Sequence, residues 1–188
     1  PALKGTDCKF YLMWANHDVD TLWNMHVDTD WTKPRPNLWS GQVSRAVLEP
    51  MFDRIIDKYL QLDCYYRIAG KPVFSIFDYP NLIGGLGGVG PTANAFAWMR
   101  RRCVERGLPG LDIQAIGRMQ AGVEAGAKLA SGSEAAAARS LGFDSATAYQ
   151  YCMDGGWTGD YVVWANQAIN TWSAYESLHG TYYPHASI

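Results

Sequence analysis

Short apolar runs and helical apolar patterns alternate along the 188-residue chain. Apolar runs that end in polar or turn residues predict buried strands, which we expect at residues 8–15, 72–77, 111–116, 143–151 and 182–188. Apolar side chains that recur every three or four residues predict the intervening helices, at residues 49–60, 91–106, 134–141 and 161–179. Strands that alternate with helices in this way are typical of a parallel sheet with helical crossovers.

Two α/β architectures fit this order. One is a partial (β/α)8 barrel of the TIM type with about five parallel strands, and the other is an open doubly wound sheet of five strands. A complete barrel needs about 250 residues, and the chain ends on a predicted strand with no helix after it. We therefore expect residues 1–188 to form a single domain, the middle section of a larger barrel.

Net charge, apolar runs and aromatic content indicate which kinds of binding partner to expect. A net charge of −2 gives no reason to expect nucleic acid, and no run is long and apolar enough to span a bilayer. Eight Trp and eleven Tyr, many of them outside periodic segments, favour a binding surface over a Trp-rich core.

The cysteine spacing and the first residues of the chain give limited information on the cellular compartment. Cys8, Cys64, Cys103 and Cys152 are widely spaced without a C-x-x-C pair, so we expect free, buried thiols. The chain starts at Pro1 without a Met or a signal peptide, and localisation stays open, with the periplasm or secretion favoured over the cytoplasm.

A polar and aromatic stretch follows the first predicted strand. The apolar run ends at Trp14 and leads into a long loop, residues 17–42. Ligands of parallel α/β proteins bind at the carboxyl ends of the strands, where such loops converge. We expect the substrate-binding residues there to be Trp14, Asn16, His17, Asp18, Trp23, Asp78, Tyr149 and Tyr151. Aromatic planes can stack on the apolar face of a sugar while amides and carboxylates bind its hydroxyls, so carbohydrate is the predicted ligand.

Two other motifs suggest different ligands. The D-x-D pairs at residues 18–20 and 28–30 could hold a divalent metal in a glycosyltransferase, although aspartates in loops are commonly solvated. Gly85 to Gly90 matches G-x-G-x-x-G but does not directly follow a strand, which favours a flexible loop over a dinucleotide site. We expect neither a metal site nor a cofactor.

The residues do not reveal a catalytic pair. Glycoside hydrolysis usually needs two carboxylates, and all five glutamates lie in or beside predicted helices. The aspartates that follow predicted strand ends are Asp18, Asp78 and Asp154. Asp18 and Asp78 could form a pair, but aspartates at such places are commonly turn residues.

Four segments carry a family resemblance: Trp14-Ala15-Asn16, the Ile-Ala-Gly-Lys-Pro-Val-Phe run at 68–74, Leu-Gly-Phe-Asp at 141–144 and Tyr-Tyr-Pro-His at 182–185. Together they resemble glycoside hydrolase family 99-like proteins, which include endo-α-mannosidase-like enzymes and bacterial proteins labelled as WbsX-type glycosyltransferases. The resemblance implies a (β/α)8 barrel that acts on glycans, with Trp14 and Asn16 lining the sugar site. Many relatives have Glu after Trp-Ala-Asn, where this chain has His17, so no role carries over to that residue.

In such proteins the catalytic glutamates lie in an Asn-Glu-Trp-x-Glu-like segment after a later strand, and this sequence contains no Asn-Glu-Trp. We therefore expect the chain alone to be inactive, with an oligosaccharide or polysaccharide as its partner. The alternatives are a metal-dependent glycosyltransferase that uses a D-x-D pair, a non-catalytic carbohydrate-binding barrel, and a nucleotide-binding sheet.

Overall fold

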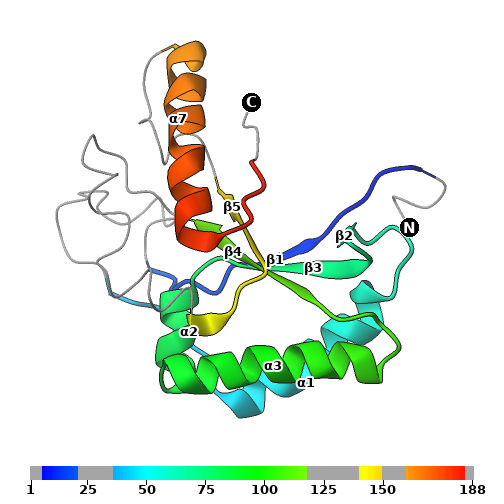
Figure 1. Cartoon of the computed structure of the whole chain (residues 1–188). Helices are drawn as coiled ribbons and strands as arrows, with labels where there is room; N and C mark the ends of the chain where they lie inside the picture. The colour runs from blue at the N-terminus through cyan, green and yellow to red at the C-terminus, as the bar shows by residue number, and fades with distance from the viewer. Residues whose placement is uncertain (1–5, 21–35, 118–139, 150–159, 185–188) are drawn as a thin grey trace.

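The computed structural model describes residues 6–20, 36–117, 140–149 and 160–184. These residues form an α/β fold built on a five-stranded, mainly parallel sheet (Figure 1). The strands are β1 (Leu12–Trp14), β2 (Arg67–Ile68), β3 (Lys71–Ile76), β4 (Asp112–Gly117) and β5 (Ser145–Ala148). The helices are α1 (Arg45–Ile55), which continues into a π-helical segment (Ile56–Leu60), α2 (Tyr79–Leu86), α3 (Val89–Glu105) and α7 (Tyr161–His179).

The parallel strands lie side by side in chain order, β1-β3-β4-β5. Beyond β5, Tyr182 forms a further parallel bridge with Ala146. The short strand β2 pairs antiparallel with β3 through a tight turn at Ala69 and Gly70, whose φ angles are 48° and 81°. A doubly wound sheet requires the strand order to reverse at a switch point, and the described strands show no such reversal.

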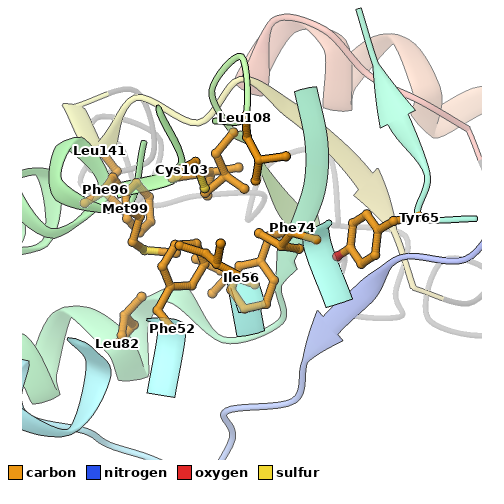
Figure 2. Close-up of a cluster of buried hydrophobic side chains, with 14 residues drawn as sticks. Phe52, Ile56, Tyr65, Phe74, Leu82, Phe96, Met99, Cys103, Leu108 and Leu141 are labelled. Atoms are coloured by element: carbon orange, nitrogen blue, oxygen red, sulfur yellow. The ribbon is translucent and has the colours of Figure 1, made fainter. Parts of the chain in front are cut away.

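The main hydrophobic core lies between one face of the sheet and the helices α1, α2 and α3 (Figure 2). Phe74 and Ile76 of β3 and Ile113 of β4 face these helices and are at most 1% exposed. Phe52 of α1 packs edge-to-face on Phe74, with ring centroids 5.6 Å apart. Helix α7 packs against β5 instead, where Tyr175 contacts Ala148.

The opposite face of the sheet is buried and polar. Side chains alternate between the two faces of a strand, so Ser75, Gln114 and Ser145, which are paired across β3, β4 and β5, share this second face. Ser75 Oγ donates to Gln114 Oε1 at 2.6 Å, and Gln114 Nε2 donates to Ser145 Oγ at 3.4 Å. Ser145 Oγ in turn donates to Asp112 Oδ1 at 2.6 Å. A hydrogen-bonded chain therefore crosses three strands on the face away from the helices.

Several predicted elements are confirmed. The helix expected at 161–179 is α7, with the Asp160 side chain accepting from Val162 N at 2.7 Å and Gly180 at a φ of 83° after its end. The helix expected at 91–106 is α3, and Gly107 follows it with a φ of 83°. The predicted helix at 134–141 falls largely outside the described residues.

The glycine segment differs from its prediction as a flexible loop. Gly84 to Leu86 form the last turn of α2, a helix that the sequence pattern did not predict. Gly87 and Gly88, with φ angles of 88° and 125°, make the sharp turn into α3. Positive φ angles favour glycine, so the glycines serve a helix-to-helix connection, and α2 separates them from β3.

The first predicted strand is also shorter than expected. Only Leu12–Trp14 pair with β3, because residues 64–66 lie next to Phe10 instead. Phe10 N donates to Cys64 O at 3.1 Å, and Tyr66 N donates to Phe10 O at 2.7 Å.

Of the cysteines expected to be buried thiols, Cys8 is exposed, Cys64 is half-buried and Cys103 is buried. Burial raises the pKa of Cys103 to about 12 and keeps it protonated at neutral pH. Cys152 lies outside the described residues.

Within the part of the chain that the structure describes, none of the helices has the length and hydropathy needed to cross a membrane.

Candidate functional site

Three rings line up just beyond the carboxyl ends of the sheet. His17 follows β1, Phe77 follows β3 and Tyr149 follows β5. The ring centroids of His17 and Phe77 are 5.5 Å apart with an interplanar angle of 65°, and those of Phe77 and Tyr149 are 4.9 Å apart with an angle of 69°. We call His17, Phe77 and Tyr149 the ring row.

Strand register explains why these rings meet. Trp14 pairs with Ile76, so the next residues, Ala15 and Phe77, would lie opposite each other and on the same face of the sheet. Side chains two residues apart share a face, so His17 is on the face of Ala15 and Phe77. Tyr149, two residues after Thr147, is on the same face by the same count. The ring row therefore belongs to the polar face of the sheet, away from the helical core.

Asn16 joins the ends of β1 and β3. Its side chain is 2% exposed, its Nδ2 donates to Asp78 O at 2.6 Å, and its Oδ1 accepts from Asp78 N at 2.8 Å. Asn81 Nδ2 donates to Asn16 O at 2.8 Å. Asp78 in turn caps α2, because its Oδ1 accepts from Asn81 N at 3.0 Å. These bonds fix the residue before His17 and the residue after Phe77.

Asp18 holds two distant segments together. Its Oδ1 accepts from Gly41 N at 2.8 Å and from Asn81 Nδ2 at 3.1 Å, while its Oδ2 accepts from Asn37 Nδ2 at 2.8 Å. The Gly41 amide, followed by the Asn81 amide, holds the pKa of the Asp18 carboxyl below its ordinary value. Both carboxylate oxygens of Asp18, the first aspartate of the pair at 18–20, therefore accept hydrogen bonds from the protein.

The predicted long loop is closed at its base. Val19 and Trp39 form an antiparallel bridge, with Val19 N donating to Trp39 O at 2.9 Å and Trp39 N donating to Val19 O at 3.1 Å. Gly41 lies so close to the segment after β1 that an added Cβ would clash with the backbone oxygen of Asn16. We call residues 18–19 and 37–41 the neck.

The other predicted site residues are placed differently. Trp14 is half-buried and packs against the helical core, on the face opposite to the ring row. Trp23, Tyr151 and the D-x-D pair at 28–30 lie outside the described residues. His17, Asp18 and Tyr149 are on the strand ends as predicted.

Phe77 is not among the predicted site residues. This residue is apolar and ends a continuous apolar run, so the run was assigned to a buried strand as a whole. Counting alternate positions from Phe74 and Ile76 would have put Phe77 on the opposite face, next to the predicted edge.

Among the described residues, no group of three or more His, Cys, Asp or Glu side chains is arranged to hold a metal ion. Comparison of the chain with protein-family models, with curated proteins and with solved structures gives no match in any of the three.

Proposed function

We propose that this chain is part of a (β/α)8 barrel that binds a glycan at the carboxyl edge of its sheet. The observation that carries the proposal is the ring row, three rings in contact that come from three strand ends. The apolar face of a sugar ring can pack on an aromatic plane, and Tyr149, which is 36% exposed, offers both a ring and a hydroxyl group.

Two features support the barrel. The parallel strands follow chain order without a reversal, which is the order of a (β/α)8 sheet. The face away from the helices carries the buried chain of Ser75, Gln114, Ser145 and Asp112, and parallel sheets are covered on both faces. In a barrel this second face would be the packed interior.

The resemblance to glycoside hydrolase family 99-like proteins belongs to the same proposal. It gives glycan processing as the function of a complete barrel, with the catalytic glutamates outside this chain. The glycosyltransferase alternative is less well supported, because Asp18 already accepts hydrogen bonds from Gly41, Asn37 and Asn81.

A glycan array tests the proposal. The chain is applied to mannose-, glucose- and galactose-based oligosaccharides, and the affinity for the strongest binder is measured by titration calorimetry with and without EDTA. We expect binding that EDTA leaves unchanged, and a Kd raised about threefold to tenfold by Phe77→Ala or Tyr149→Ala.

Tyr59→Ala is the matched control. Tyr59 is 39% exposed and lies in the π-helical segment that precedes β2 and β3, at the opposite end of the strands. The proposal is wrong if no glycan binds, or if Tyr59→Ala weakens binding as much as the ring-row variants do. Binding of a nucleotide sugar only in the presence of Mn²⁺ would favour the glycosyltransferase.

A further inference from the structure

Trp39 is unusually exposed for a tryptophan. Its side chain is 75% exposed, the largest fraction among the big apolar side chains of the described residues, and the adjacent Leu38 is 61% exposed. Large aromatic side chains are mostly buried to a high degree, and an exposed apolar patch commonly marks a binding surface.

The backbone that carries this side chain is fixed. Trp39 exchanges two hydrogen bonds with Val19, and Leu38 N adds a third to Val19 O at 2.8 Å. The Asn37 side chain also accepts from Trp39 N at 3.1 Å. A fixed backbone avoids the entropy cost of ordering a loop on binding, and a tryptophan side chain has only two χ angles to immobilise.

Asp18 links Trp39 to the ring row. Its carboxylate binds both flanks of the tryptophan, Asn37 on one side and Gly41 on the other. His17, the residue immediately before Asp18, is the first ring of the row. The exposed tryptophan is therefore joined through Asp18 to the first ring of the row, His17.

We propose that Trp39 is a second stacking position, so that the ligand is an oligosaccharide that extends from the ring row to the neck. This inference rests on the proposed function and names the size of its ligand. One sugar unit packs on the ring row, and a later unit of the same chain packs on the indole of Trp39. A monosaccharide occupies the ring row alone.

A length series tests this inference. The strongest binder from the array is prepared as a ladder from monosaccharide to hexasaccharide, and Kd is measured by calorimetry for the wild-type chain and for Trp39→Ala. We expect the wild-type affinity to increase with length, and Trp39→Ala to weaken the longer ligands about threefold to tenfold without changing monosaccharide binding.

Trp39→Phe and Phe77→Ala complete the design. Trp39→Phe keeps a flat ring and should retain part of the length dependence, whereas Phe77→Ala should weaken ligands of every length. The melting temperature of Trp39→Ala should equal that of the wild type, because the side chain is mostly in solvent.

The outcomes separate the two proposals. If Trp39→Ala keeps the full length dependence, or weakens all lengths equally, the second stacking position is wrong while glycan binding at the ring row stands. If no member of the array or the ladder binds, both proposals are wrong.

Discussion

Asn16 and Asp78 are joined by two hydrogen bonds that use both polar atoms of the Asn16 side chain. The donor and the acceptor of Asp78 are backbone atoms. The side-chain amide of Asn16 therefore takes the place of a backbone hydrogen-bonding partner where β1 and β3 end. Because both polar atoms are engaged and the side chain is 2% exposed, we expect Asn16 to position the neighbouring rings rather than to contact a sugar.

Asn16→Ala should lower the free energy of unfolding by about 1–3 kcal/mol, because it leaves the Asp78 amide without its buried acceptor. Urea denaturation measures this change. Asn94→Ala is the control, since Asn94 is exposed on α3 and the substitution should leave stability unchanged or slightly raised. Equal unfolding free energies for Asn16→Ala and the wild type would contradict the structure of this joint.

Gly41→Ala should disturb the neck. The new Cβ would clash with Asn16 O and His17 O, and both are backbone atoms that cannot rotate away. We expect a loss of about 1–3 kcal/mol in stability. We also expect weaker binding of long glycans, because the strain acts between the ring row and Trp39.

Gly90→Ala provides the comparison for that experiment. An added Cβ at Gly90 meets nothing within 4 Å, and Gly90 lies in the first turn of α3. Alanine should be neutral there or stabilising by up to about 1 kcal/mol. Similar melting temperatures for the two glycine variants would show that the neck does not lie against Asn16 and His17 as described.

We expect the buried carboxyl group of Asp112 to make the stability of the fold depend on pH. Burial raises the pKa of its carboxyl above the ordinary value, and the hydrogen bond from Ser145 opposes this rise. The folded state therefore binds this proton more tightly than the unfolded state, so the contribution of Asp112 to stability falls as pH rises through the raised pKa.

Asp112→Asn removes this titration and keeps an oxygen for the Ser145 hydroxyl. The stability of Asp112→Asn relative to the wild type should increase between about pH 4 and pH 7, measured by urea denaturation across that range. Ser145→Ala removes the opposing hydrogen bond, raises this pKa further and should enlarge the total loss of stability with rising pH. A difference between Asp112→Asn and the wild type that stays constant with pH would contradict the burial of this carboxyl.

The sequence predicted the elements whose patterns are long and periodic. Helices α3 and α7 and strands β3 and β4 have clear apolar faces or runs, and each was located within a few residues. The elements that were missed are short: β2 has two residues, and α2 has eight residues that include two glycines. Such segments are stabilised by tertiary contacts, which local propensity does not report.

The positions of several candidate residues after strand ends were predicted, but the hydrogen bonds between them were not. Asn16, His17, Asp18 and Asp78 were assigned to strand ends from the apolar-to-polar transition alone. The partners of Asn16 and Asp18 lie up to 65 residues away along the chain, as in the Asn81 bond to Asn16 O, and nothing local encodes that pairing. The bridge between Val19 and Trp39 also forms only in the folded chain.

The hydroxyl group of Tyr65 has a consequence for the order of folding. It accepts from Leu12 N at 3.0 Å and donates to Val73 O at 2.7 Å, so it stands between β1 and β3 at the amino end of their pairing. Leu12 therefore completes its hydrogen bonding only after a residue 53 positions later has reached β3. Because contacts between residues so far apart form slowly, we expect β1 to be the last of these strands to join the sheet, after the β2–β3 hairpin has closed.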